Sequence, residues 1–183
     1  MSVRPVRVYG DPVLRQRALS VEDLDDTLRQ LMADMRDTMR AYRGVGLAAN
    51  QVGVLQRVVV VEVPVAEEQT VALTLINPEL SEATGSGISE EGCLSIPGIY
   101  EDVRRAQHVR VRALDAEGKA LDFTAEGYLA CVVQHEVDHL NGVLFVDRLS
   151  MLKRQFLRRA LDALARGELP EGYSPPLARG GGA

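Results

Sequence analysis

The chain has 183 residues, of which 46% are hydrophobic and 26% are charged, and these values predict a single globular domain with a full core. Its net charge of −5 disfavours a general nucleic-acid binder, because neutralising phosphate groups requires an excess of basic residues. The sequence shows no membrane span and no signal peptide, and it has two cysteines, so we expect a cytoplasmic protein without membrane or specific DNA partners.

The first long element is an amphipathic helix that we predict from Leu24 to Tyr42. Ser20 is its expected N-cap, because a serine hydroxyl can accept a hydrogen bond from a backbone N–H of the first turn. Apolar side chains recur at steps of three and four residues, at Leu24, Leu28, Leu31, Met35 and Met39. The glycines Gly44 and Gly46 are expected to end the helix.

Two buried strands are predicted next, from Arg57 to Val63 and from Val71 to Asn77, because both stretches are rich in β-branched residues. Pro78 is expected to end the second strand. The residues from Ser81 to Gly92 are rich in serine, glycine and glutamate and are predicted to form a loop. Alternating apolar residues from Val109 to Phe123 predict an antiparallel hairpin with one solvated face.

Two further helices are predicted, from Tyr128 to Leu140 and from Ser150 to Arg166. The apolar side of the second is expected to comprise Leu152, Phe156, Ala160, Leu161 and Leu164. Strands and helices do not alternate strictly, so the fold class is α+β, with mostly antiparallel sheets packed around the helix at 128–140. We expect one domain over residues 1–166 and a flexible tail, rich in proline, glycine and serine, over residues 167–183.

The strongest functional signal lies in the central helix, in the motif His135-Glu136-Val137-Asp138-His139. Residues four apart share one helix face, so both imidazoles can reach one metal ion. Glu136 lies one step round the helix, where it can accept a proton from the water that the metal activates. A solvated helix with two histidines is the alternative, but the chain has three histidines and two fall at this spacing. The third, His108, is expected to be a surface residue.

A catalytic metal site usually has a third protein ligand, and two cysteines are available for that position. Cys131 shares a helix face with His135, but it lies about 12 Å from His139 along the axis at a rise of ~1.5 Å per residue. One ion cannot bind all three from a straight helix. Cys93, between Gly92 and Leu94, is therefore the better candidate, and Cys131 is expected to line the cavity or to belong to the core.

Three motifs, in this order, resemble the peptide deformylase family. They are Gly44-Val45-Gly46-Leu47-Ala48-Ala49-Asn50-Gln51, Glu91-Gly92-Cys93-Leu94-Ser95 and His135-Glu136-Val137-Asp138-His139. The last motif alone is shared with many metalloproteases, whereas the ordered set is specific, and the resemblance covers the chain up to the tail. It implies an enzyme that removes the formyl group from the N-terminal methionine of nascent polypeptides and releases formate.

The resemblance also implies a cofactor and roles for single residues. The cofactor is one divalent metal ion, typically Fe²⁺, with Ni²⁺, Co²⁺ or Zn²⁺ as alternatives that this ligand set also suits. The metal ligands in the family pattern are Cys93, His135 and His139. Glu136 is the general base and acid, and the side-chain amide of Gln51 and the backbone N–H of Leu94 stabilise the oxyanion.

Substrate contacts are expected at residues whose backbone a peptide can approach. The family binds its substrate in extended form, so Val45, Gly46 and Gly92 are candidates for main-chain contacts, although glycines can also serve chain reversal alone. Tyr128 and Cys131 lie before His135 on its helix face and are candidates for the methionine pocket. A plain core position remains the alternative for both.

Two other functions remain open from the sequence: a metallopeptidase of the H-E-x-x-H type and a non-catalytic module that binds formylated N-termini. Glu136 and Gln51 disfavour the pure binder, because binding alone needs no proton transfer. The final helix is basic through Lys153, Arg154, Arg158, Arg159 and Arg166. A solvated face is the usual explanation for such charges, and weak docking on ribosomal RNA is a further hypothesis.

Overall fold

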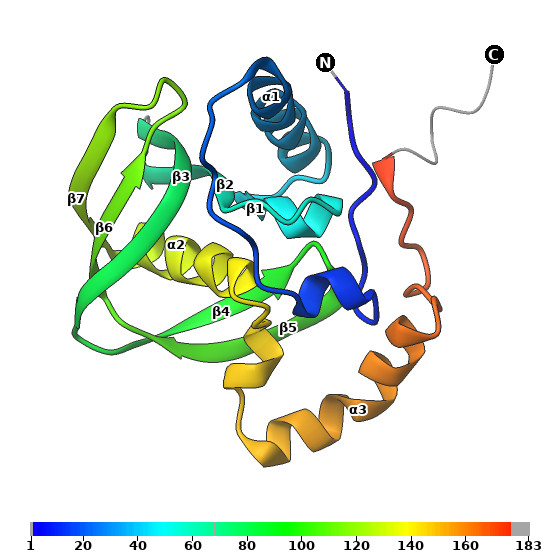
Figure 1. Cartoon of the computed structure of the whole chain (residues 1–183). Helices are drawn as coiled ribbons and strands as arrows, with labels where there is room; N and C mark the ends of the chain where they lie inside the picture. The colour runs from blue at the N-terminus through cyan, green and yellow to red at the C-terminus, as the bar shows by residue number, and fades with distance from the viewer. Residues whose placement is uncertain (1, 68, 177–183) are drawn as a thin grey trace.

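The computed structural model describes residues 2–67 and 69–176 of the chain. Its strands form a five-stranded sheet in the order β1-β2-β3-β6-β7 and a separate two-stranded sheet of β4 and β5, and all pairs are antiparallel. Figure 1 shows helix α2 between the larger sheet and the β4–β5 hairpin. The predicted α+β class, with mostly antiparallel sheets around a central helix, is confirmed.

Helix α1 (Asp26–Ala41) begins at Asp25, whose side chain accepts a hydrogen bond from the backbone N–H of Leu28 at 2.8 Å. The prediction of Ser20 as N-cap is wrong, because the chain before Asp25 is irregular. In that segment the backbone N–H of Val21 donates a hydrogen bond to Oδ1 of Asn77, and the carbonyl of Val21 accepts one from Nδ2 of the same side chain. The predicted apolar face is confirmed, and it buries Leu28, Leu31, Met35 and Met39.

Strand β2 (Val58–Ala66) is an inner strand of the larger sheet, between β1 and β3, and from Val58 to Val61 it is buried on both of its faces. Side chains alternate between faces along a strand, so Val58 and Val60 pack with the residues of α1, whereas Val59 and Val61 pack with those of α2. A run of β-branched residues fits such a doubly covered strand. The sheet therefore separates two apolar clusters, one under each helix.

Strand β3 (Gln69–Thr84) is longer than predicted, because Pro78 does not end it. The pairing of β3 with β6 shifts register between Ile76 and Glu79, and Asn77 has a positive φ of 53°. Such a bulge removes the need for a ladder hydrogen bond from the proline. A proline inside a strand pattern can therefore mark a bulge instead of an end.

Strands β4 (Gly87–Cys93) and β5 (Ile96–Arg105) form a hairpin that the sequence did not predict. The prediction of a loop from Ser81 to Gly92 is wrong for the described residues, since β3 extends to Thr84 and β4 pairs with β5 along its length. Strand β4 has few apolar side chains, and its strand form depends on cross-strand pairing and not on its own pattern.

The predicted second hairpin is confirmed as β6 (His108–Leu114) and β7 (Ala120–Glu126). The Asp115 carboxylate accepts hydrogen bonds from the backbone N–H groups of Glu117 and Lys119 in the turn. His108 is exposed, as expected.

Helix α2 (Gly127–Leu140) is confirmed close to its predicted bounds, and most of its second half is buried. Helix α3 (Met151–Ala165) follows Ser150, whose side chain accepts a hydrogen bond from the backbone N–H of Lys153. Its predicted apolar side is wrong up to Ala160. Leu161 and Leu164 are buried, but the other expected members are exposed, namely Leu152, Phe156 and Ala160.

Three short 3-10 helices complete the described elements: η1 (Pro12–Arg15), η2 (Ala49–Val52) and η3 (Phe145–Arg148), while strand β1 (Gly46–Ala48) directly precedes η2. After α3 the chain turns back along the molecule, as Figure 1 shows for the orange and red segment. The flexible tail predicted from residue 167 stays a prediction, and residues 177–183 lie outside the described part. Among the described residues, no helix is long and apolar enough to cross a membrane.

Candidate active site

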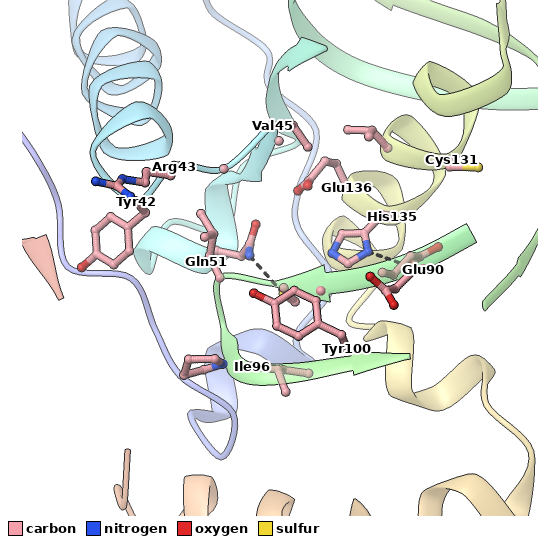
Figure 2. Close-up of a pocket in the computed structure, with 18 of the residues that line it drawn as sticks. Tyr42, Arg43, Val45, Gln51, Glu90, Ile96, Tyr100, Cys131, His135 and Glu136 are labelled. Atoms are coloured by element: carbon pink, nitrogen blue, oxygen red, sulfur yellow. Dashed lines mark hydrogen bonds and ion pairs between the residues drawn. The ribbon is translucent and has the colours of Figure 1, made fainter. Parts of the chain in front are cut away.

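A cavity of about 360 Å³ opens between the β1–η2 segment, the β4–β5 hairpin and helix α2. Figure 2 shows Gln51 from η2, and Val45 directly before β1, facing the same space as His135 and Glu136 from α2. Strand β1 pairs with β2, and α2 packs against both strands. The cavity is therefore bounded by the packed core on two sides.

Three potential metal ligands meet at the inner end of this cavity. The Sγ atom of Cys93 lies 3.2 Å from Nε2 of His139, and Nε2 of His139 lies 3.2 Å from Nε2 of His135. All three donor atoms lie within 4.8 Å of one another, and both histidines are buried. The helix provides two donors at a spacing of four residues, and the end of β4 provides the third.

A buried ionic network holds one of these histidines. The Glu91 carboxylate accepts a hydrogen bond from Nδ1 of His135 at 2.8 Å, so Nε2 faces the cluster. Arg105 donates two hydrogen bonds to Glu91, of 2.6 and 2.9 Å, and a further one to Asp138, which also pairs with Arg148. Burial raises the pKa of Glu91, but hydrogen bonds from Arg105 and His135 outweigh burial and lower the pKa to about 2.

Glu136 has the opposite electrostatic environment. Its side chain is buried, and burial raises its pKa to about 7. One of its carboxylate oxygens has no hydrogen-bond partner in the described part of the chain. A buried carboxyl group with a pKa near neutrality can both accept and donate a proton under physiological conditions.

The side-chain amide of Gln51 is fixed at both of its polar atoms. Its oxygen accepts a hydrogen bond from the backbone N–H of Ala48 at 2.8 Å, and its nitrogen donates to Oγ of Ser95 at 3.2 Å. The same nitrogen lies 3.6 Å from Sγ of Cys93. The amide is therefore oriented with its N–H groups toward the metal-ligand cluster, the orientation that an oxyanion donor requires.

The remaining residues that the sequence singled out also line the cavity. They are Leu94, Val45, Gly46, Gly92, Tyr128 and Cys131. Gly46 has a specific reason to lack a side chain, because a Cβ atom there would overlap the Glu136 carboxylate. Tyr128 is 49% exposed and Cys131 is partly buried, so neither has the burial of a plain core residue.

Comparison with known proteins identifies the family. The family model described as polypeptide deformylase matches residues 3–155. The chain belongs to this family. The peptide deformylase of Alkalilimnicola ehrlichii is 53% identical over 167 residues, which cover 91% of this chain and 93% of that protein.

Solved deformylase structures share the fold. The peptide deformylase of Legionella pneumophila superposes with a TM-score of 0.82 and 45% identity, covering 92% of this chain and 100% of that one. The enzyme of Thermus thermophilus gives a TM-score of 0.83 and 41% identity, covering 90% of this chain and 99% of that one. The peptide deformylase assignment made from the three motifs is thus confirmed.

The donor cluster fits the divalent metal ion expected of a deformylase. Bonds of about 2.0–2.3 Å from a tetrahedral ion to nitrogen and sulfur separate the ligand atoms by roughly 3.3–3.6 Å. The two separations of 3.2 Å at His139 are close to this range, and all three donor atoms lie within 4.8 Å of one another. A thiolate with two imidazoles suits several transition metals, so the donor set does not select one ion.

Sequence reasoning missed the network that supports this deformylase site. Glu91 and Asp138 each stand inside a recognised motif, so their proximity to metal ligands was a usable signal. Arg105, which joins them, has no local signal, because it is 14 residues from Glu91 and 33 from Asp138 along the chain. Tyr42 and Tyr173, which also line the cavity, were missed for the same reason.

Proposed function

We propose that this chain hydrolyses the N-terminal formyl group of formylmethionyl nascent peptides and releases formate. The observation that carries the proposal is the meeting of Cys93, His135 and His139 beside the buried Glu136 carboxylate and the oriented Gln51 amide. These groups are the parts that amide hydrolysis needs: a metal site, a proton acceptor and a donor for the developing oxyanion.

The metal would be held by Cys93, His135 and His139, and we propose Fe²⁺ as the native ion, with Ni²⁺, Co²⁺ or Zn²⁺ as substitutes. When bound, a divalent ion supplies Lewis acidity and lowers the pKa of a coordinated water. The hydrogen bond from Nδ1 of His135 to Glu91 leaves Nε2 as the ligand atom and fixes the ring. One negative charge from the thiolate makes this site less cationic than a site of three histidines.

Glu136 would move the proton during the reaction. Its carboxylate accepts a proton from the attacking water and later gives that proton to the departing amine of the methionine. A pKa of about 7 suits both steps, because the group is then neither too weak a base nor too weak an acid. Burial is the main cause of this raised pKa, so the packing around Glu136 helps to make the carboxyl group suitable for proton transfer.

The oxyanion that forms on the formyl oxygen would be stabilised by Gln51 and Leu94. The Gln51 amide is oriented before substrate arrives by its bonds to Ala48 and Ser95. We assign the second donor to the backbone N–H of Leu94, which follows a metal ligand at the end of β4. Loss of one such donor typically reduces the rate by about 10²–10³.

The peptide would enter in extended form between β1 and β4. Val45, Gly46 and Gly92 are our candidates for main-chain contacts on the two sides of the cavity. We propose that Tyr128 and Cys131, at the other end of α2 from His139, contact the methionine side chain. All metal and proton-transfer residues lie within the domain proposed at 1–166.

We further propose that the protein acts in the cytoplasm and docks weakly on ribosomal RNA through α3. Arg154 and Arg159 are exposed on that helix, and so are Met151, Leu152 and Phe156. Charge reversal at Arg154 and Arg159 is expected to reduce co-sedimentation with ribosomes at low salt without changing formate release from a free peptide. Unchanged co-sedimentation would contradict the docking proposal.

A formate-release assay on formyl-Met-Ala-Ser tests the function. The wild type is expected to release formate without cleaving peptide bonds, and Glu136→Ala is expected to lose at least about 10² in turnover, the scale of general-base catalysis. Peptide-bond cleavage of unformylated peptides would instead indicate a metallopeptidase. Binding of the formyl peptide without turnover would indicate a non-catalytic binder.

A further inference from the structure

The chain after α3 is directed to the outer end of the active-site cavity. Gly167 (φ 81°) ends the helix in a Schellman motif, in which its N–H donates to Leu164 and the N–H of Glu168 donates to Ala163. The helix end is also fixed against the N-terminal segment, because a Cβ atom at Gly10 would lie 2.6 Å from Cα of Ala165. These contacts fix the C-terminal end of α3 and therefore the starting point of the segment that follows it.

The following residues pack on the tip of the β4–β5 hairpin region. Pro170 lies close to Gly98: a Cβ atom added at position 98 would be 2.9 Å from Cγ of Pro170. The backbone N–H of Tyr173 donates to the carbonyl of Pro170 at 3.0 Å, and Gly172 has the positive φ that the third position of a type II turn requires. This turn presents Tyr173 to the cavity, which it lines.

A second tyrosine, from the C-terminal end of α1, lines the same part of the cavity. Tyr42 is partly buried, and its hydroxyl oxygen accepts a hydrogen bond from the backbone N–H of Val6 at 3.5 Å. The two phenols lie near one another: burial raises the pKa of Tyr173, and the neighbouring phenol of Tyr42 raises it further. Two aromatic side chains from distant parts of the chain thus share one wall.

This wall lies away from the end of the cavity proposed for methionine. Figure 2 shows Tyr42 and Cys131 on opposite sides of the site, with Gln51 and His135 between them. A cavity of about 360 Å³ has the size of a small-ligand pocket and exceeds the needs of one side chain. An extended peptide advances about 3.3–3.6 Å per residue, so its later residues leave the methionine end and reach another wall.

We propose that Tyr42 and Tyr173 form a specificity subsite that favours an aromatic side chain at the second or third residue of the formyl peptide. The proposal deepens the proposed function and rests on it. Aromatic rings attract other aromatic and large apolar side chains through burial and edge-to-face contact. The C-terminal segment would then be part of the substrate groove and not only a tail.

Three peptides test the proposal: formyl-Met-Phe-Ser, formyl-Met-Ala-Phe and the reference formyl-Met-Ala-Ser. We expect the wild type to turn over at least one phenylalanine peptide with a kcat/KM about fivefold above the reference. Tyr173→Ala is expected to abolish this preference, so that neither phenylalanine peptide is turned over faster than the reference. Tyr173→Phe is expected to retain the preference, because the ring and not the hydroxyl makes the contact.

Ser174→Ala is the matched control, because Ser174 is exposed in the same segment and does not line the cavity. It is expected to behave as the wild type with all three peptides. An equal loss on all peptides in Tyr173→Ala, or no preference in the wild type, would overturn the subsite. A wild type that releases formate from none of the peptides would overturn the proposed function, and the subsite with it.

Discussion

Two buried carboxylates beside His135 have opposite pKa shifts. Burial raises the pKa of Glu136 to about 7, whereas the hydrogen bonds from Arg105 and His135 outweigh burial at Glu91 and lower its pKa to about 2. Glu91 therefore stays ionised and orients a histidine, while Glu136 can exchange a proton near neutral pH. Both residues are glutamates, so their different roles arise from their surroundings.

The choice between the two cysteines as metal ligand can be decided by metal content. Cys93→Ala is expected to lose most bound metal, because Sγ of Cys93 lies 3.2 Å from Nε2 of His139. Cys131→Ala is the matched control and is expected to retain the metal, since Cys131 is outside the donor cluster. Elemental analysis of the purified variants measures this, and equal metal content in the two would contradict the assignment.

The network around Glu91 makes a second prediction about metal affinity. Glu91→Gln removes the charged partner of His135 Nδ1 and of Arg105, and metal affinity is expected to fall by about 10- to 100-fold. Glu101→Gln is the control, because Glu101 pairs with Lys153 on the surface side of the same hairpin. Competition with a chromogenic chelator measures both affinities. An unchanged affinity in Glu91→Gln would show that the ring is held by other contacts.

At the scale of elements, the site depends on the close approach of strand β1 to helix α2. Gly46 lies in β1, and the absence of a side chain there makes room for the carboxylate of Glu136. Residues of β1 and α2 also share one buried cluster, which includes Ala48 and Val137. The small residues of the first motif therefore set the distance between a strand and the catalytic helix.

Gly46→Ala is expected to reduce formate release by at least tenfold while metal content is retained. The added methyl group would displace the Glu136 carboxylate, and such small misplacements of a reacting group are costly. Gly87→Ala is the control in β4, because a Cβ there would meet only the flexible side chain of Gln107, at 2.9 Å. Wild-type turnover in Gly46→Ala would show that the carboxylate can shift without loss.

The elements that could be predicted from sequence are those with a distinct apolar pattern of their own. Helix α1 was predictable because Leu28 and Met35 recur at helical spacing, and strand β2 because the residues from Val58 form a run of valines. Strand β4 was not, because its order comes from pairing with β5 and its own residues are mostly polar or glycine. The metal ligands could be predicted from motifs, whereas Arg105 acts through contacts that only folding creates.

At the scale of the whole molecule, both described ends of the chain lie against the core and reach the active-site region. The N-terminal segment binds α1 through Arg4, whose guanidinium contacts Asp34 and whose backbone N–H donates to Thr38. The same segment holds Tyr42 through Val6. The stability of the outer wall of the cavity is therefore coupled to contacts that lie far from the metal ligands.

The stabilisation that Asp34 provides by binding the N-terminal segment depends on pH. Burial raises the pKa of Asp34, but hydrogen bonds from Gln30 and Arg4 and the charge of Arg4 outweigh it and hold the pKa below its ordinary value. A group with a lowered pKa in the folded state stabilises the protein fully above its unfolded pKa of about 4. That contribution is lost as the pH falls through the lower folded pKa.

Asp34→Asn is therefore expected to lower the free energy of unfolding by about 1.5–3 kcal/mol at pH 7, the range for hydrogen bonds to a charged group. The difference from the wild type is expected to shrink as the pH falls below about 4, because the unfolded wild-type chain is protonated at Asp34 first, and to disappear once the pH is below the lowered pKa of the folded state. Urea unfolding at pH 7 and pH 3 measures this, with Asp26→Asn as the control, since the Asp26 side chain on the same helix is fully exposed. A constant difference across this range would mean that the ionised carboxylate of Asp34 does not stabilise the fold.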